Sequence, residues 1–228
     1  MKFSFCVITI FLLGCISETF AADQLPSQKE FYPPSGKGRV IMVISGHLSP
    51  GEVAYYAKDI AAQGYYAVLV DGRDFWRKGL NGAGLPLLKG VIARAQQSPH
   101  ALPGKVAVVA FSQGGASALT YAARMPESVS AVVAYYPMTD FITNPGAFVS
   151  KIKVPTLIFA GVLDTYEGCC VIERARQLAA AAQAGGVMLR VVEYPDAPHG
   201  FVLKNTKAWR GNDASDAFRR TLDYLQRT

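Results

Sequence analysis

The sequence predicts an α/β fold: one domain built on a mostly parallel β-sheet with helices on both faces and no large lid. Short runs rich in Val and Ile alternate with longer segments of helical periodicity along the chain. The short runs lack a regular polar and apolar alternation, which is typical of strands covered on both faces. A length of 228 residues with 50% hydrophobic content suits one substantial core. We therefore expect a single folded domain.

The first half of the chain shows the alternation clearly. Residues 39–45 (RVIMVIS) form the first expected strand. Apolar residues at helical spacing predict a helix over 52–63, which Gly64 ends. The strand 65–70 follows, and a second helix is expected from about 85 to 97.

The second half repeats the pattern. Apolar, β-branched runs predict the strands, and an Ala-rich segment stopped by Gly185 and a final segment with one apolar face predict the helices. These elements are strands over 131–136, 154–160 and 187–194 and helices over 170–184 and 213–226.

The N-terminus has the pattern of a signal peptide over residues 1–22. A lysine precedes a short apolar run, and Ala21 and Ala22 offer a cleavage site. We expect an exported, periplasmic or secreted protein with a polar lead-in segment over 23–38, which could add an edge strand, and the folded domain over 39–228. The alternative is a lipoprotein anchored through Cys15, the one case in which a membrane is expected as a partner.

The net charge is +6, but lysines and arginines are scattered and form no block of like charge. This distribution does not predict nucleic-acid binding. A small-molecule substrate remains the expected partner.

The central stretch 105–119 (KVAVVAFSQGGASAL) combines a buried strand with a small-residue helix, and Ser112 stands at the break. A serine at a sharp strand-to-helix turn is typical of the nucleophile elbow of α/β-hydrolases. Small neighbours are needed because the turn is strained and the helix passes close to it. The alternative is a serine that merely caps the helix.

Two further loops supply the partners that a serine nucleophile needs. Asp164 follows the penultimate strand and His199 follows the last one, so the order Ser, Asp, His is that of α/β-hydrolases. Histidine can take the serine proton near neutral pH, and a carboxylate orients the imidazole. Asp140 is the rival acid, but its strand is not the penultimate one. We therefore predict Ser112, Asp164 and His199 as the catalytic triad.

The oxyanion of an acyl-transfer reaction needs two backbone N–H donors. One is expected from Gln113, the residue after the nucleophile. The other is expected from the loop after the first strand, at Gly46 or His47, with the His47 side chain incidental.

These motifs together resemble the dienelactone hydrolase family of α/β-hydrolases, in an exported branch. The matching segments are the ISG loop, AAQGYYAVLVDGRD, AFSQGG, AVVAYYP, AGVLD and EYPDAPHGF. The resemblance implies hydrolysis of an ester or lactone with no metal or organic cofactor. It assigns the nucleophile to Ser112, the acid to Asp164 and the base to His199.

The chain departs from the best-known members of that family at two positions. Ser112 stands where they have a cysteine, and Ser45 stands where they have a glutamate. We therefore expect a general carboxylic ester hydrolase. The alternatives are a catalytically silent binding protein with the same fold and a small serine peptidase.

Substrate selection is expected from Arg73 and nearby aromatic residues. A guanidinium can hold a carboxylate through two parallel hydrogen bonds, and aromatic walls suit a flat acyl group. The alternative is that Arg73 is a turn residue paired with Asp71 or Asp74. The aromatic candidates are Phe75, Trp76, Tyr135 and Tyr136.

Cys169 and Cys170 are the adjacent cysteines that remain after signal cleavage. They are either two small hydrophobic residues at a helix start or a vicinal disulfide, which export would favour. Bridging adjacent residues closes a small ring and would stiffen the nearby acid loop, which ends in Asp164. Metal and redox sites usually separate their cysteines by two residues or more, so no metal site is predicted.

Overall fold

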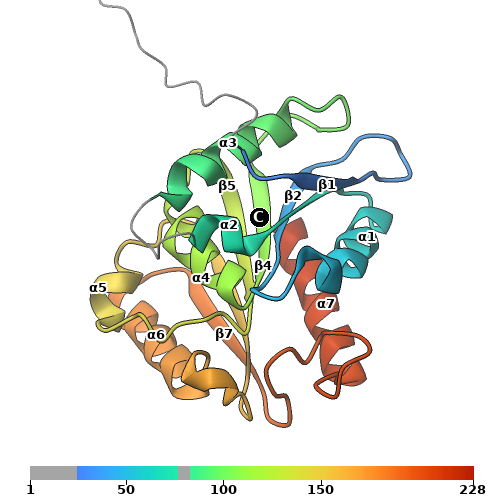
Figure 1. Cartoon of the computed structure of the whole chain (residues 1–228). Helices are drawn as coiled ribbons and strands as arrows, with labels where there is room; N and C mark the ends of the chain where they lie inside the picture. Colours follow the sequence, from blue (N-terminus) through green and yellow to red (C-terminus); the bar gives the residue numbers. More distant parts are fainter. Residues whose placement is uncertain (1–24, 77–82) are drawn as a thin grey trace, which may run out of the picture.

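The fold is organised around a seven-stranded sheet in the order β1-β3-β2-β4-β5-β6-β7 (Figure 1). This computed structural model describes residues 25–76 and 83–228, so the expected signal peptide and Cys15 lie outside the described residues. All neighbouring strands pair in parallel except β1 and β3. The strands are β1 Gln28–Phe31, β2 Val40–Ile44, β3 Tyr66–Val70, β4 Val106–Phe111, β5 Val129–Tyr135, β6 Thr156–Gly161 and β7 Leu189–Tyr194. The predicted α/β fold with a mostly parallel sheet is confirmed.

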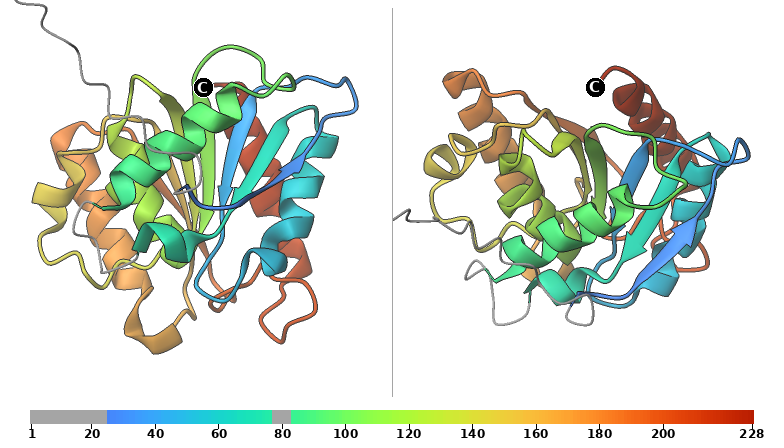
Figure 2. Two further views of the ribbon diagram at one scale, coloured as in Figure 1. Left: turned by 45° about the horizontal axis from the view of Figure 1, so that its top comes forward. Right: turned by 90° about the horizontal axis from the view of Figure 1, so that it is seen from above.

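Helices cover both faces of this sheet, as Figure 2 shows from two sides. Helices α1 and α7 pack on one face, and α3, α4 and α6 pack on the other. The helices are α1 Ala54–Ala62, α2 Gly72–Trp76, α3 Gly84–Gln96, α4 Gln113–Thr120, α5 Pro145–Val149, α6 Ile172–Gly185 and α7 Gly211–Gln226. The short helices α2 and α5 were not predicted, because five residues are too few to show a helical period.

The central strand β4 explains why the apolar strands show no alternation. Val106, Val108 and Ala110 point into the core layer beneath α3 and α4, whereas Val109 and Phe111 point into the layer beneath α1 and α7. All six residues of β4 are buried, since side chains on opposite faces of a strand both meet helices.

The two edges of the sheet are built differently. The lead-in segment supplies β1, which pairs antiparallel with β3 from Gln28↔Val70 to Phe31↔Ala67. At the other edge, β7 keeps part of its surface exposed, and Glu193 there pairs with Arg176 of α6. No helix within the described ranges is both long enough and apolar enough to cross a membrane.

Candidate active site

Ser112 occupies a sharp turn between strand β4 and helix α4. Its φ of 51° and ψ of −117° lie in a region that a serine adopts only under constraint. The two glycines after it, Gly114 and Gly115, have no room for a larger side chain. A Cβ on Gly114 would stand 2.2 Å from the Ser45 carbonyl oxygen, and one on Gly115 would stand 2.8 Å from Pro137 Cβ. The glycines thus let α4 pass close enough to hold the serine in this conformation.

His199 joins Ser112 to Asp164 through two hydrogen bonds. Its Nε2 lies 3.0 Å from Ser112 Oγ, and its Nδ1 lies 2.8 Å from Asp164 Oδ2. The Asp164 side chain is fully buried, and its Oδ1 also accepts the Tyr166 backbone N–H at 3.1 Å. The rival acid, Asp140, is exposed. The structure therefore brings together the three residues that the sequence predicts as a triad, in the order nucleophile, base and acid.

The acid and base loops touch through their backbones. A Cβ on Gly161, at the end of β6, would stand 2.2 Å from the Ala197 carbonyl oxygen. The Leu163 N–H donates to that same carbonyl at 3.1 Å. This close approach sets the distance between the loop that carries Asp164 and the loop that carries His199.

The expected oxyanion donors lie around Ser112. A Cβ on Gly46 would stand 3.3 Å from Ser112 Cβ and 3.9 Å from its Oγ, so the Gly46 backbone borders the nucleophile. Gln113 is the first residue of α4, where a backbone N–H has no acceptor within the helix. Donation from Gly46, His47 and Gln113 to an oxyanion stays a prediction.

Two tyrosines enclose the His199 imidazole. The Tyr166 ring stacks on it, with centroids 4.6 Å apart and planes 14° apart, and the Tyr136 ring meets it edge-on at 4.7 Å. Tyr166 Oη also lies 3.2 Å from His47 Nε2, so the His47 side chain is part of the site and not incidental. Tyr166 was not predicted, although its position two residues after the acid is a signal that could have found it.

Tyr136 was predicted as a rim residue, and the structure brings it to the site. Its φ of 36° turns the chain directly after β5, and its hydroxyl has no hydrogen-bond partner among the described residues. Burial raises the pKa of Tyr136 well above its usual range, so the hydroxyl stays protonated.

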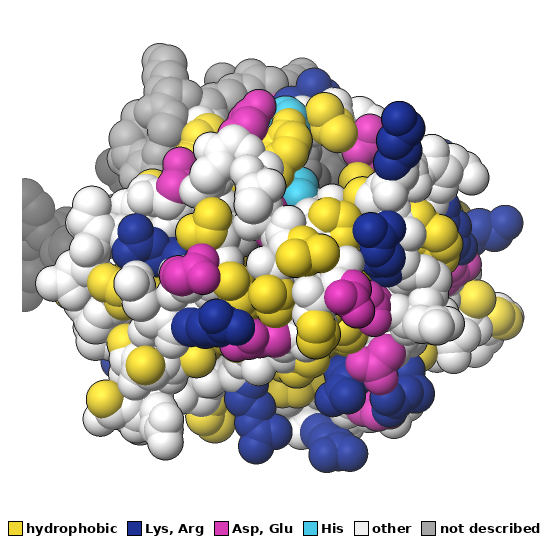
Figure 3. Space-filling model, turned by 90° about the horizontal axis from the view of Figure 1, so that it is seen from below, with side chains coloured by type: hydrophobic (Ala, Val, Ile, Leu, Met, Phe, Trp, Pro, Cys, Tyr) yellow, Lys and Arg dark blue, Asp and Glu magenta, His cyan; other side chains and the backbone are white. Residues whose placement is uncertain are grey.

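A small, mainly hydrophobic pocket of about 50 Å³ opens beside Ser112. Its lining residues all belong to the described part of the chain. They include one carboxylate, Glu52, and neither lysine nor arginine. From below, histidine side chains reach the surface among hydrophobic ones (Figure 3). The lining consists of Gly46, His47, Leu48, Ser49, Glu52, Val53, Phe111, Ser112, Tyr136, Tyr166, His199 and Leu203.

Two of the predicted aromatic substrate residues belong instead to the core. Phe75 is buried beneath α3, and Tyr135 is fully buried between the sheet and α7. The Tyr135 hydroxyl bonds to Tyr56 Oη at 2.5 Å and Thr221 Oγ1 at 2.6 Å. The prediction failed because Tyr135 ends strand β5 and Phe75 lies in the short helix α2, and the sequence does not state in which direction the side chain points at either place.

Arg73 is a turn residue paired with Asp71, as the alternative interpretation of the sequence had it. Its guanidinium holds the Asp71 carboxylate through Nε and Nη2, and it is absent from the lining of the pocket beside Ser112. The Arg73 side chain is 54% exposed. Trp76 packs edge-on against Phe141, and its role at a substrate rim stays a prediction.

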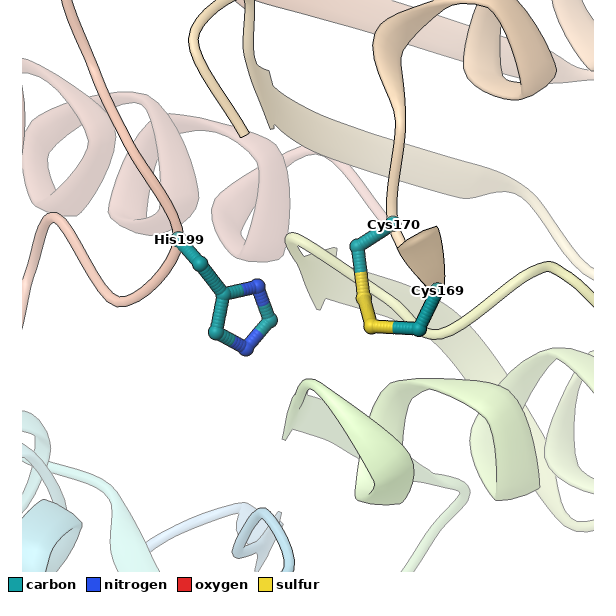
Figure 4. Close-up of side chains that lie close together, drawn as sticks. All are labelled: Cys169, Cys170 and His199. Carbon is teal, nitrogen blue, oxygen red and sulfur yellow. A yellow bond between two sulfur atoms is a disulfide. The ribbon is translucent and has the colours of Figure 1, made fainter. Parts of the chain in front are cut away.

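Cys169 and Cys170 form a vicinal disulfide that faces His199 (Figure 4). The Cys169 carbonyl accepts the backbone N–H groups of Thr139 at 2.8 Å and Asp140 at 3.1 Å. These three side chains, Cys169, Cys170 and His199, are the one cluster of metal-ligating groups found within the described ranges. The bridged sulfurs are poor ligands, so the oxidised cluster does not resemble a metal site.

Comparison with known proteins places the chain in a family. The sequence profile of the Dienelactone hydrolase family matches residues 72–228. The chain belongs to the dienelactone hydrolase family. The resemblance seen in the sequence motifs is thereby confirmed.

Two curated relatives resemble the chain in sequence. Two curated relatives, both named "Putative carboxymethylenebutenolidase", come from Methylorubrum extorquens and Yersinia pestis. The relative from Methylorubrum extorquens is 27% identical over 61% of this chain, and the one from Yersinia pestis is 30% identical over 53% of it. The matches span 48% and 46% of those relatives, so the chain spans about half their length.

A crystal structure named "Putative Dienelactone Hydrolase", from Klebsiella pneumoniae, superposes with a TM-score of 0.74. The match covers 89% of this chain and 99% of that one at 16% identity, and it shows a shared fold.

Proposed function

We propose that this protein is a serine hydrolase that cleaves carboxylic esters or lactones through an acyl-enzyme. The observation that carries the proposal is the pair of hydrogen bonds that His199 forms, with Ser112 Oγ at Nε2 and with Asp164 Oδ2 at Nδ1. Family membership supports an ester hydrolase activity. The strained conformation of Ser112 supports a catalytic role over simple helix capping.

The proposed reaction begins when Ser112 Oγ attacks the substrate carbonyl carbon. His199 Nε2 takes the hydroxyl proton, and the buried Asp164 carboxylate stabilises the imidazolium that forms. Backbone N–H groups of Gln113 and of Gly46 or His47 would hold the oxyanion.

The imidazolium then gives its proton to the leaving alkoxide oxygen as the C–O bond breaks. In a lactone, that oxygen stays in the acyl chain. A water molecule next attacks the acyl carbon and gives a proton to His199, and Ser112 leaves as the free hydroxyl. The proposed sequence needs the side chains and backbone N–H groups of the chain and a water molecule.

The pocket beside Ser112 favours a short, uncharged group. About 50 Å³ offers room for about three to five water-sized atoms. The carboxylate of Glu52 at its lining would repel an anionic group. We therefore propose neutral esters or lactones with a short group at this position, in place of the carboxylate-bearing substrate considered from sequence.

The test combines covalent labelling with hydrolysis. A fluorophosphonate probe should label the wild type, and Ser112→Ala should abolish both labelling and cleavage of short p-nitrophenyl esters. Removal of Ser112 or His199 should cost about 10⁴-fold or more in kcat. Ser150→Ala, at an exposed serine, is the matched control. Labelling that persists in Ser112→Ala would contradict the nucleophile assignment.

The same panel separates the alternatives. Cleavage of peptides and not esters would favour a small serine peptidase. Binding of an ester without turnover would favour a catalytically silent binding protein.

Export remains a proposal that rests on the signal-like segment at residues 1–22 and on the Ala21 and Ala22 cleavage site. A disulfide at Cys169 and Cys170 supports an oxidising compartment. N-terminal sequencing of the mature protein tests this proposal, and a lipid-modified Cys15 would favour the lipoprotein alternative.

A further inference from the structure

The vicinal cysteines lie beside the residue on which the proposed function depends. Ligand atoms of Cys169, Cys170 and His199 all lie within 4.8 Å of one another. Both cysteines are buried, and the His199 side chain is 14% exposed. Figure 4 shows the disulfide and the imidazole facing the same space between the two loops.

Reduction would change the chemistry of this cluster completely. Two thiolates and one imidazole are a ligand set that Zn²⁺ prefers, with Zn–S near 2.3 Å and Zn–N near 2.0–2.1 Å. Tetrahedral ligands of one zinc ion then stand roughly 3.5–4 Å apart. Ligand atoms as far apart as 4.8 Å need to approach by only about 1 Å, and the two sulfurs, which are bonded in the oxidised protein, need to move apart; side-chain rotation can supply both movements.

The backbone would keep the cysteines in place after the bridge opens. The Cys169 carbonyl is held by the N–H groups of Thr139 and Asp140, two donors that lie outside the disulfide ring. The turn before the pair is fixed by the left-handed residues Glu167 and Gly168. The thiols would therefore appear beside His199 and not swing into solvent.

We propose that reduction of the Cys169–Cys170 disulfide creates an inhibitory Zn²⁺ site formed by the two thiolates and the His199 imidazole. This proposal rests on the proposed role of His199 in catalysis. The site exists only in the reduced protein, because the cysteines are bridged in the oxidised one.

Reduction of the Cys169–Cys170 disulfide needs a two-electron reductant, for which we take a dithiol. The dithiol supplies two electrons and two protons to the S–S bond, which becomes two thiols, and the dithiol itself becomes a disulfide. Zn²⁺ then displaces the two thiol protons and accepts the lone pair of one imidazole nitrogen.

Zn²⁺ should inhibit the enzyme whether it binds Nε2 or Nδ1 of His199. Coordination through Nε2 removes the acceptor for the Ser112 proton, and coordination through Nδ1 breaks the hydrogen bond to Asp164. In both cases one of the two hydrogen bonds that join Asp164, His199 and Ser112 is lost, and His199 can no longer act as the base.

The first test measures metal binding without reference to activity. Full-length protein is prepared oxidised, or reduced with dithiothreitol that is then removed under anaerobic conditions. Competition with a chromogenic chelator should give one Zn²⁺ per reduced chain and none per oxidised chain. Cd²⁺ should give a thiolate-to-metal absorption band in the reduced sample only.

Variants identify the ligands. Reduced Cys169→Ser/Cys170→Ser should lose the site. His199→Ala should weaken it by at least about tenfold, since loss of even a hydrogen-bond partner of a ligand costs about ten- to a hundredfold. His100→Ala, at a histidine paired with the Gly36 carbonyl, is the matched control and should bind normally.

The second test measures ester hydrolysis. Zn²⁺ should inhibit the reduced enzyme, a chelator should restore it, and the oxidised enzyme should be unaffected. Equal Zn²⁺ binding by oxidised and reduced protein, or normal binding by His199→Ala, would overturn the proposal. Binding without inhibition would overturn the regulatory role. A protein with no esterase activity would still report on the metal site, so the two proposals fail separately.

Discussion

The ring of Tyr166 lies nearly parallel to the imidazole of His199, with centroids 4.6 Å apart and planes 14° apart. Tyr166 comes from the same loop as Asp164, and its backbone N–H donates to the Asp164 carboxylate. One loop therefore fixes both the hydrogen-bond partner and the stacking surface of the imidazole. Tyr166 acts through His199, as a positioning residue.

Replacing Tyr166 should separate stacking from hydrogen bonding. Tyr166→Phe keeps the ring and removes the bond to His47, whereas Tyr166→Leu removes both. An aromatic pair contributes about 0.5–1.5 kcal/mol, so we expect Tyr166→Leu to lower kcat about two- to tenfold, and more than Tyr166→Phe does. Steady-state kinetics on a short ester provide the measurement. Equal kcat in the two variants would mean that the ring does not position His199.

Gly161→Ala should disturb the contact between the acid and base loops. The new Cβ would stand 2.2 Å from the Ala197 carbonyl oxygen, so the loops must separate. We expect a loss of about 1–3 kcal/mol in the free energy of unfolding and a larger fall in kcat than rise in KM. Gly185→Ala is the matched control, because its Cβ would meet only Val187 Cγ2 at 3.7 Å. Similar urea midpoints for the two variants would contradict this interpretation.

Arg73→Ala should affect charged and neutral substrates alike. The guanidinium is paired with Asp71 at the surface, where solvent screens the attraction between the two charges. We expect KM to change less than about fivefold for two esters that differ only in a carboxylate. Arg176→Ala removes a comparable exposed pair with Glu193 and serves as control. A KM increase confined to the carboxylate-bearing ester would restore Arg73 as a substrate residue.

Asp216 should stabilise the fold in a pH-dependent way. Burial alone would raise its pKa, but hydrogen bonds from Arg220, Tyr194 and Arg219 outweigh burial and lower it. A lowered folded pKa gives stability that is present above the ordinary aspartate pKa of about 3.9 and lost as the pH falls through the folded value.

The corresponding experiment compares Asp216→Asn with the wild type in urea. We expect the variant to be less stable by about 0.5–1 kcal/mol near pH 7, because the partners are partly exposed, and equal to the wild type near pH 2. Asp223→Asn, on the same helix and with a longer pair to Arg219, should change stability less. A difference that does not depend on pH would show that the carboxylate charge is irrelevant.

Much of the fold and the proposed triad could be predicted because they depend on features that the sequence states directly. Buried parallel strands read as continuous apolar runs, and Ser112, Asp164 and His199 follow strands β4, β6 and β7, whose carboxyl ends lie at the same edge of the sheet. The small residues after Ser112 also have a direct steric cause in the approach of α4 to Ser45.

The surroundings of the site depend on directions that the sequence does not state. Tyr135 and Tyr136 are neighbours, yet one ends strand β5 inside the core and the other turns toward His199 with a φ of 36°. Arg73 lies in the five-residue helix α2, which is too short to show a period. Tyr166 lies two residues after Asp164, a position that indicates proximity to the site, but the sequence does not state that its ring stacks on the imidazole.

His199 follows β7, which comes after β4 and β6 along the chain, so it is the last of the three groups to be synthesised. A chain that is growing from its N-terminus carries Ser112 early, beside no base, and gains Asp164 before it gains His199. On the proposed mechanism, an unfinished chain is inert toward esters until strand β7 has docked. Hydrolysis thus begins only once the loop after β7 has brought His199 to Ser112 and Asp164.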